Sequence, residues 1–244
     1  MRIFLIFIFS CISVFSLHNA VANQNQIVKI ATAEWQPYIT MKNPNHGHFG
    51  QIVDSVFKQM NMQVEYVNAP WKRIETLLKN GDVFAGIPYS YTPERHQYFD
   101  YSLPLMNSQY GFFYLKSHYP RGINYQQLND LKKYRIGGVI GYWYENLFMQ
   151  NRLNIEYVAT DEQGIIKLYG KRVDLIITDI SVGWHLIDKL YPNQRQQFAV
   201  MPKLLGEQKL YLMISKTYPH SRELMQHFNQ TLQQLRQHGQ FSEF

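Results

Sequence analysis

A serine and an arginine five residues apart follow a short apolar segment in the first half of the chain. Ser90 and Arg95 come after residues 83–87, an apolar run that Gly81 precedes. Glycine is typical of a helix end, so the run that follows it is predicted to be a buried strand. Pro93 favours a turn or the first turn of a new helix, because its missing N–H costs little there.

Recognition of an anion is the chemistry that Arg95 offers. Its planar guanidinium pairs with a carboxylate through two parallel N–H···O bonds, and the Ser90 hydroxyl can add a donor. In an open α/β sheet, a loop at the carboxyl end of a strand faces the cleft in which ligands bind. The spacing alone does not show that Arg95 is functional, because most arginines in turns are ordinary surface charges.

The elements that must position this loop alternate between strand and helix. They are a strand at 27–32, a helix from Gln51, a strand at 63–67, a helix from Pro70 that ends at Gly81, and the strand before Ser90. This βαβαβ order predicts a parallel sheet with right-handed crossovers.

After a strand at 109–116, the second half repeats that order without repeating the sequence. The predicted elements are strands at 134–139, 155–159 and 173–178, with helices at about 144–150, from Thr160 to Gly170 and at 181–190. Thr160-x-x-Gln163 is a capping box. Asp179 follows the last buried strand as Ser90 follows its counterpart, and by itself it predicts an N-cap. Two further strands and a long C-terminal helix complete the chain.

The N-terminus has the pattern of a secretory signal peptide. Arg2 precedes an apolar run at 3–17, and Ala20-Val21-Ala22 ends the segment. The run is too short to favour a membrane span, although an uncleaved anchor is the alternative. We therefore expect residues 1–22 to be removed on export to the periplasm. Cys11 is the only cysteine, so the expected mature chain has none.

Composition argues against two classes of partner. The formal net charge is +6, but the basic residues are scattered and no basic tract is interleaved with aromatic residues. Binding to nucleic acid is therefore not expected. His46 and His48 lack a third candidate ligand nearby, so no metal is expected either. Aromatic residues make up 15% of the chain, which suggests aromatic walls in a binding site as well as a core.

The segment from Gly81 to Leu105 carries the most specific motif. Ser90-x-Thr-Pro-Glu-Arg95, followed by Phe99-x-Tyr-Ser-x-Pro-Leu105, resembles the signature region of the family 3 periplasmic solute-binding proteins, which include the histidine-, glutamine- and lysine/arginine/ornithine-binding proteins. The resemblance extends from about residue 27 to the C-terminus.

For the fold, the resemblance implies an α/β, type II periplasmic binding protein fold, with two βαβ lobes joined by two hinge strands. Lobe 1 would comprise residues 23–111 and 204–244, and lobe 2 residues 112–203. The hinge strands would be 109–116 and about 204–212, and closure about such hinges is a common switching motion.

For the site, the resemblance implies a cleft that holds a free amino acid. Arg95 would bind the ligand carboxylate with the help of Ser90, and Asp179 would bind the α-amino group. Trp35 and Trp71 would lie against the ligand side chain, where stacking or a cation–π contact could add affinity. The alternative for both tryptophans is packing in the core beneath the sheet edge.

The turn after the first strand of lobe 2 departs from the family pattern. Proteins of the family often have a small polar turn there, whose hydroxyl and amides also bind the carboxylate. Here the turn is Gly141-Tyr142-Trp143. Gly141 could keep backbone donors, but Trp143 replaces the hydroxyl and fills space. This favours a ligand with an apolar or aromatic face, or else an aromatic lid packed between the lobes.

The expected function is capture of a small zwitterionic ligand and its delivery to an inner-membrane ABC permease or to a sensor. We expect a monomer that is not an enzyme and needs no cofactor. One alternative is a dehydratase similar to the cyclohexadienyl dehydratases of the same fold, for which Glu34 and Glu145 are the candidate acids. Another is an orphan sensor or adaptor that binds a protein partner.

Overall fold

One mixed sheet runs through the whole molecule. The computed structural model describes residues 26–42 and 46–241, so the predicted signal peptide at 1–22 lies outside the described residues. The main path of the sheet is β2-β1-β3-β10-β5-β8-β6-β7. Its strands are β1 (Gln26–Thr32), β2 (Met62–Asn68), β3 (Ala85–Ser90), β4 (Phe99–Tyr101), β5 (Met106–Leu115), β6 (Ile136–Val139), β7 (Ile155–Val158), β8 (Leu175–Asp179), β9 (Phe198–Val200) and β10 (Gly206–Ser215).

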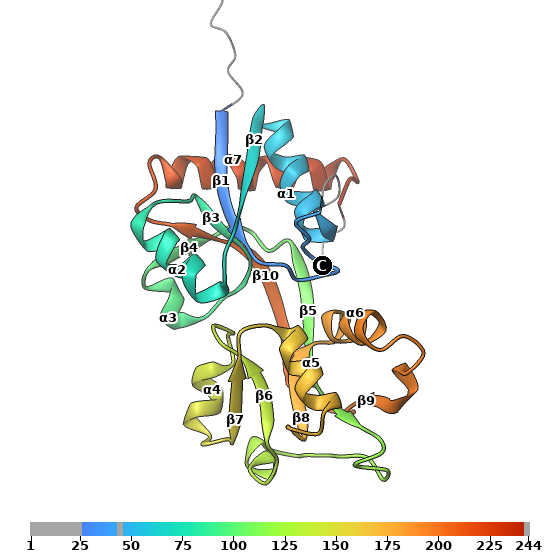
Figure 1. The fold of residues 1–244 in the computed structure, drawn as a ribbon. Helices are drawn as coiled ribbons and strands as arrows, with labels where there is room; N and C mark the ends of the chain where they lie inside the picture. The colour runs from blue at the N-terminus through green and yellow to red at the C-terminus, as the bar shows by residue number, and fades with distance from the viewer. Residues whose placement is uncertain (1–25, 43–45, 242–244) are drawn as a thin grey trace, which may run out of the picture.

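Helices cover the sheet at both ends, and the molecule divides into two lobes (Figure 1). The α-helices are α1 (Gly47–Gln59), α2 (Trp71–Asn80), α3 (Pro93–His96), α4 (Glu145–Gln150), α5 (Asp161–Tyr169), α6 (Ile180–Leu190) and α7 (Ser221–Gln237). Two 3₁₀ helices are η1 (Leu128–Leu131) and η2 (Arg195–Gln197). We call the part with β1–β4, α1–α3 and α7 lobe 1, and the part with β6–β9 and α4–α6 lobe 2.

The two lobes share one topology. In lobe 1, β1 pairs in parallel with β2 and β3, and in lobe 2, β6 pairs in parallel with β7 and β8. Each lobe is therefore a βαβαβ unit with the first strand in the middle. This confirms the predicted fold class, including the architectural repeat between the halves.

Strands β5 and β10 join the lobes (Figure 1). They pair antiparallel with each other from Met106 to Tyr110 and from Gly206 to Leu210. Further along, β5 pairs with β8 and β9 of lobe 2, whereas β10 pairs with β3 and β4 of lobe 1. The predicted lobe boundary at 111/112 falls inside β5 and that at 203/204 just before β10, and these boundaries stay a prediction.

Local sequence explains how the helices next to the strand tips begin and end. Thr92 caps α3 by accepting a hydrogen bond from the backbone N–H of Arg95, and Pro93 occupies the first turn. Thr160 likewise caps α5 and accepts from the Gln163 N–H, as the capping box predicts. Gly81 ends α2 in the left-handed conformation, with φ of +76°, which glycine adopts without steric cost.

Two boundaries differ from the sequence prediction because of tertiary contacts. Helix α1 begins at Gly47 rather than Gln51, and its buried Phe49 donates a backbone hydrogen bond to the Tyr38 carbonyl at 2.9 Å. Strand β3 continues to Ser90, because Ser90 pairs with Leu210 of β10. The sequence alone places these residues in a turn and a loop.

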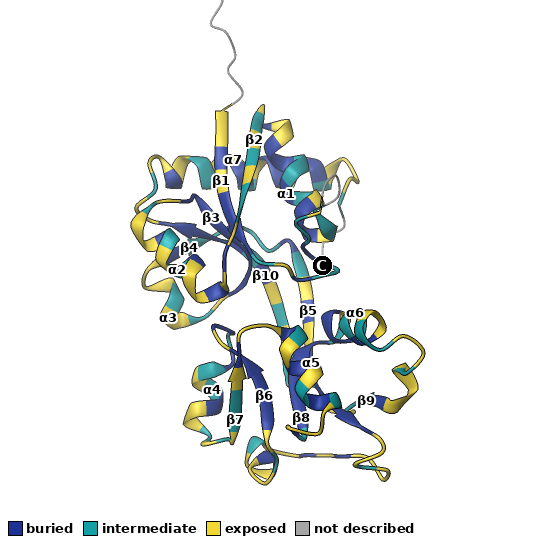
Figure 2. Ribbon diagram, viewed as in Figure 1, coloured by how far each residue is buried: buried dark blue, intermediate teal, exposed yellow. Residues whose placement is uncertain are grey.

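The core follows the strands (Figure 2). Strands β3 and β8 are buried along their whole length, as expected for the inner strands of a parallel sheet. In lobe 1, Phe57 of α1 packs against Phe228 of α7 with ring centroids 5.3 Å apart. A separate cluster in lobe 2 forms around Phe113 and Phe198.

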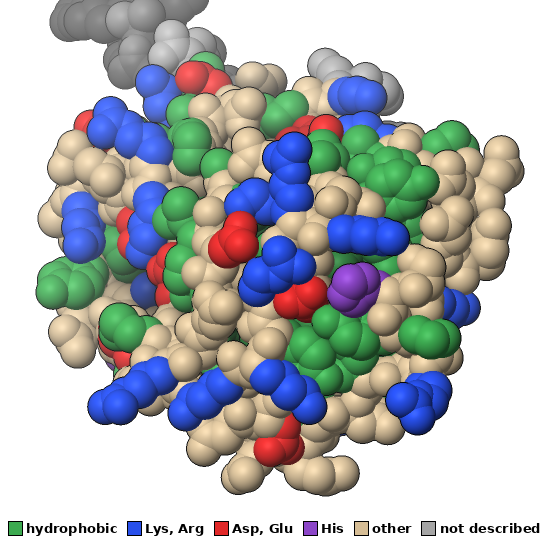
Figure 3. Space-filling view, turned by 60° about the horizontal axis from the view of Figure 1, so that its bottom comes forward, with side chains coloured by type: hydrophobic (Ala, Val, Ile, Leu, Met, Phe, Trp, Pro, Cys, Tyr) green, Lys and Arg blue, Asp and Glu red, His purple; other side chains and the backbone are tan. Residues whose placement is uncertain are grey.

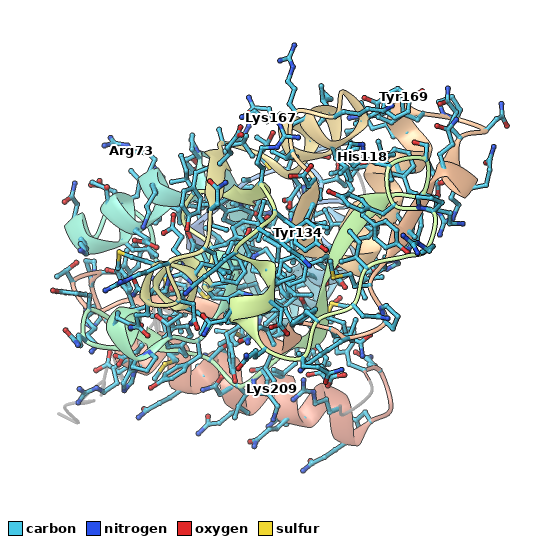
Figure 4. All side chains as sticks on the ribbon, turned by 90° about the horizontal axis from the view of Figure 1, so that it is seen from below. Arg73, His118, Tyr134, Lys167, Tyr169 and Lys209 are labelled. Atoms are coloured by element: carbon cyan, nitrogen blue, oxygen red, sulfur yellow. The ribbon has the colours of Figure 1, made fainter. Side chains whose placement is uncertain are left out.

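Charged side chains are distributed over the surface. On the face shown in Figure 3, Lys and Arg side chains are separated by polar and apolar groups. Arg73, Lys167 and Lys209 project from three different elements, α2, α5 and β10 (Figure 4). In the described ranges, no helix combines the length and the apolar character that crossing a membrane requires.

Candidate functional site between the lobes

The guanidinium of Arg95 lies where the lobes meet. Its Nη2 is 3.2 Å from Oε1 of Glu75, and its Nη1 donates to the Ser90 carbonyl at 3.3 Å. Nη2 also donates to the carbonyl of Gly141, which belongs to lobe 2. Only 11% of the side chain is exposed. Arg95 is therefore a largely buried cation that connects the two lobes, rather than a surface charge.

Arg95 lines a small cavity of about 30 Å³ between the lobes, room for about one water molecule. The structure brings all but one of the predicted site residues to this cavity. They are Trp35, Trp71, Ser90, Arg95, Gly141, Tyr142 and Trp143. Tyr89 and Tyr110 also line it, and sequence analysis does not single them out.

Aromatic rings form the walls of this cavity. The Trp35 and Trp71 rings meet edge to face with centroids 6.4 Å apart, and Trp71 meets Tyr142 of lobe 2 in the same manner at 6.3 Å. Trp143 packs against Tyr110 at 5.5 Å. Trp35 and Trp71 are both buried. The two tryptophans thus take part in core packing and also line the cavity, so the two sequence interpretations are compatible.

Gly141 holds a tight turn against lobe 1. Its φ is +89°, and a Cβ placed on it would lie 3.2 Å from the Trp71 Cβ. Its N–H donates to Oε1 of Glu145 at 2.8 Å, while its carbonyl accepts from Arg95. The N–H expected as a free donor for a ligand carboxylate is therefore engaged by Glu145 in this conformation. Glu145 also pairs with Lys72 of lobe 1 at 3.3 Å.

Asp179 is the predicted residue that does not line the Arg95 cavity. It caps α6 by accepting the Val182 N–H at 3.0 Å, and Tyr38 of lobe 1 donates its hydroxyl to Oδ2 at 3.3 Å. Asp179 is 1% exposed, and burial raises the pKa of its carboxyl. It lines a neighbouring cavity of about 290 Å³ together with Tyr38 and Glu207. Both a capping role and a position at the lobe interface are therefore observed.

Asp161 is a buried carboxylate that sequence analysis missed. The Thr178 hydroxyl donates to its Oδ1 at 2.6 Å, and the Tyr142 hydroxyl donates to Oδ2. Burial raises the pKa of Asp161 from 3.8 to about 6, opposed by these hydroxyls and assisted by the charge of Asp179. An aspartate directly after an N-cap is ordinarily a solvated first-turn residue, so no sequence signal indicates this burial.

Other candidates from the sequence have structural partners outside the cavity. His46 forms a 2.7 Å contact with Asp54 through Nδ1 and packs on Tyr66. Glu34 accepts the backbone N–H of Met41 at 2.9 Å. Within residues 26–42 and 46–241, no group of three or more His, Cys, Asp or Glu side chains is arranged to hold a metal ion.

Comparison with known proteins gives one family. The model of the bacterial extracellular solute-binding proteins, family 3, matches residues 28–244. The chain belongs to this family. Among curated proteins, none matches the sequence significantly.

Solved structures share the fold of this family 3 protein at low sequence identity. A histidine kinase sensor domain similar to periplasmic binding proteins superposes with a TM-score of 0.78 at 16% identity, covering 89% of this chain and 93% of that one. A substrate-binding protein of an ABC uptake transporter from Streptococcus pneumoniae, with bound histidine, gives 0.75 at 16% identity and 89% of each chain. An ancestral amino acid-binding protein, a precursor of cyclohexadienyl dehydratase, gives 0.71 at 19% identity, with 87% and 90% covered.

Proposed function

We propose that this family 3 protein captures a small zwitterionic ligand, an amino acid or a close relative, by closure of its two lobes. The observation that carries the proposal is the position of Arg95, a largely buried guanidinium at the lobe interface that contacts a backbone carbonyl of the opposite lobe. A ligand carboxylate would take the place of the Gly141 carbonyl and make stronger, charge-assisted hydrogen bonds.

The remaining predicted residues suit the other parts of such a ligand. Ser90, at the end of β3, could donate its hydroxyl to the carboxylate, and Asp179 could accept the α-ammonium group. Each charged hydrogen bond in such a cleft contributes about 1.5–3 kcal/mol. The rings of Trp35 and Trp71 favour a ligand with an apolar or flat side chain.

Ligand entry requires the lobes to separate. The Arg95 cavity of about 30 Å³ is far smaller than the roughly 300–1,000 Å³ of typical ligand pockets. Separation about β5 and β10 would release Arg95 from Gly141, and the ligand would then bridge the lobes as they close again. Arg95 of lobe 1 would bind the ligand carboxylate and Asp179 of lobe 2 its ammonium group. The bound ligand would therefore connect the two lobes in the closed form.

Export and delivery complete the proposal. Residues 1–22 would direct the chain to the periplasm and then be removed. Measuring the mass of the secreted protein tests this, and the expected N-terminus is near Asn23. The partner would be an inner-membrane ABC permease or a sensor. The similar structures include one protein of each kind, a transporter component and a kinase sensor domain. A monomer is the expected form of the delivering protein.

A thermal-shift screen of the exported protein against amino acids, dipeptides and aromatic acids tests the ligand class. A ligand at about 100 times its Kd adds about 2.7 kcal/mol, which for a chain of this size raises the Tm by roughly 5–11 °C. Arg95→Ala is expected to abolish the shift. Arg222→Ala, an exposed arginine on α7, is the matched control and should retain it. If no zwitterion or carboxylate shifts the Tm, the proposal is wrong.

A dehydratase is a second candidate because Asp161 is a buried carboxyl with a raised pKa that accepts a hydrogen bond from Tyr142, a residue of the Arg95 cavity. Glu34 and Glu145 already hold backbone N–H groups, whereas the pKa of Asp161 is raised to about 6, which suits a general acid. Incubation with prephenate or arogenate would detect turnover. Turnover by the unmodified protein that is lost in Asp161→Asn would favour the enzyme. No turnover by the unmodified protein at high concentration would exclude the dehydratase.

A further inference from the structure

A second, larger cavity lies between the lobes, and we call it the Asp161 groove. Its volume is about 560 Å³, within the range of small-molecule sites. Lobe 1 contributes residues 33–36 and 68–71, and lobe 2 contributes residues 159–163 with Ile166, Val182, Leu186 and Lys189. Only Trp35 and Trp71 line both this groove and the Arg95 cavity. The two indole rings therefore separate the two spaces.

Asp161 is a buried charge without a cationic partner. It is 6% exposed, and its partners are all neutral: the hydroxyls of Thr178 and Tyr142 donate to its oxygens, and the Trp35 indole N–H also interacts with it. None of the ion pairs between described residues includes it. Buried carboxylates in proteins are ordinarily paired with a cation or a metal. The missing counter-charge indicates that a cation could bind beside Asp161 with a large electrostatic gain.

The charges along the groove also favour a cationic ligand. Lys189 is the basic residue of the lining, and its Nζ is 2.9 Å from Oε2 of Glu162, so these two charges offset each other. Asp161 and Glu34 remain, which leaves the groove negative. The N-terminus of α5 stabilises the ionised form of Asp161, so the negative charge is maintained near neutral pH.

The rest of the lining is apolar and aromatic. Lobe 1 contributes the indoles of Trp35 and Trp71 to the lining, and lobe 2 contributes Ile166 and Leu186. Indole faces attract organic cations through their quadrupole. The Trp35 Nε1 is buried and interacts with the Asp161 carboxylate, so an indole ring and the carboxylate are adjacent in the groove. Trp35 itself is 4% exposed.

We propose that the Asp161 groove binds an organic ammonium or guanidinium cation with an apolar body, independently of the carboxylate cavity at Arg95. The cationic head would lie against Asp161 and an indole face, and the apolar body against Ile166 and Leu186. Such a ligand needs no carboxylate. The site therefore differs in ligand chemistry from the zwitterion site, and it stands even if the zwitterion proposal fails.

Isothermal titration calorimetry of the exported protein with phenethylamine at pH 7.5 tests the proposal, with tryptophan fluorescence as a second readout. The uncharged analogue 2-phenylethanol should bind far more weakly. Asp161→Asn is expected to weaken phenethylamine binding by about 10- to 100-fold. Phenylacetate, which carries a carboxylate in place of the amine, should not displace phenethylamine.

Because Asp161→Asn alters a buried hydrogen-bond network, an exposed position gives a second test. Ile166 lines the groove and is 47% exposed, so a charged side chain is tolerated there. Ile166→Lys should weaken phenethylamine binding by about two- to fivefold, and Ile166→Glu should strengthen it by a similar factor. Neither change should alter the Tm substantially.

Three outcomes would overturn the independent cation site. Phenethylamine and 2-phenylethanol could bind equally, the two Ile166 variants could behave alike, or phenylacetate could displace phenethylamine competitively. Binding of arginine or lysine that needs both Arg95 and Asp161, without binding of free amines, would also overturn it. That last result would support the zwitterion proposal, so the two hypotheses can fail separately.

Discussion

At the scale of single residues, buried charges dominate the region between the lobes. Arg95 is compensated by Glu75 at 3.2 Å, whereas Asp161 and Asp179 rely on hydroxyl and backbone donors. Uncompensated buried carboxylates cost stability, because burial penalises the ionised form. This cost is measurable as a dependence of stability on pH.

We expect Asp161 to make the folded protein less stable as the pH rises from 4 to 7. The pKa of Asp161 is about 6 in the folded state and near 3.8 when the chain unfolds, so the folded state binds the proton more tightly. Stability is then fully present below pH 3.8 and is lost as the carboxyl ionises toward pH 6 and above. The lost stability is on the order of 3 kcal/mol.

Urea unfolding of the protein and of Asp161→Asn at pH 4 and pH 7.5 measures this effect. The difference in unfolding free energy should move in favour of the variant as the pH rises. Other carboxyl groups contribute to both proteins and cancel in the difference. A difference that stays constant between the two pH values would contradict the prediction.

Gly141→Ala is expected to weaken lobe closure. The residue has φ of +89°, and the added Cβ would approach Trp71 of the opposite lobe at 3.2 Å. An L-residue in this conformation costs about 1–2 kcal/mol, and the new contact acts against the closed form. Gly239→Ala is the control, because Gly239 follows α7 with φ of +73° and a Cβ there meets no atom within 4 Å. Ligand affinity should fall in the first variant and not in the second.

At the scale of elements, two helical glycines of lobe 2 have opposite environments. Gly183 of α6 packs directly on Phe113 of β5, and a Cβ would lie 2.5 Å from the ring. Gly164 of α5 has space, since its Cβ would make an ordinary contact at 3.6 Å with Ile176. Close packing of α6 on the sheet therefore depends on glycine, whereas that of α5 does not.

Alanine at these two positions should change stability in opposite directions. Gly183→Ala is expected to destabilise by about 1–3 kcal/mol through overpacking. Gly164→Ala should stabilise by up to about 1 kcal/mol, because alanine has the higher helix propensity. Urea denaturation of the two variants provides the comparison. A stabilised Gly183→Ala would show that α6 can move away from β5 at little cost.

At the scale of the whole molecule, a few polar contacts hold the lobes together. Gln36 of lobe 1 contacts His185 of α6 at 2.7 Å, Lys72 pairs with Glu145 at 3.3 Å, and Arg95 reaches the Gly141 carbonyl. Most of these contacts are weak individually. An equilibrium between closed and open forms is the physical consequence, and a ligand that bridges the lobes shifts it.

Lys72→Met should shift the ligand-free protein toward the open form. The ion pair with Glu145 is partly exposed, with 54% and 27% of the two side chains accessible, so its loss changes the equilibrium by no more than about fivefold. Small-angle scattering should show a larger radius of gyration. Lys167→Met, which breaks a pair within lobe 2, is the control. An equal increase in both variants would contradict an effect on closure.

Much of this fold is encoded locally in the sequence. The apolar run before Ser90, the glycine that ends α2 and the N-cap at Thr160 each concern residues a few positions apart, and the structure confirms them. The second half of the predicted capping box differs, since the Gln163 side chain accepts from the Ala159 N–H. Helix capping and strand burial are decided by neighbouring side chains and backbone geometry. The motif from Ser90 to Arg95 likewise identified the family, which the match over residues 28–244 confirms.

Only the tertiary structure decided which polar groups are buried and what they bind. Tyr38 and Asp179 meet across 141 positions, and Arg95 meets Gly141 across 46. Asp161 has the local sequence of a solvated first turn, yet it is 6% exposed and binds the hydroxyls of Tyr142 and Thr178, which are 19 and 17 positions away. Burial and charge pairing arise from segments far apart in the chain, so the Asp161 groove and the cavity at Arg95 exist only once the two lobes meet.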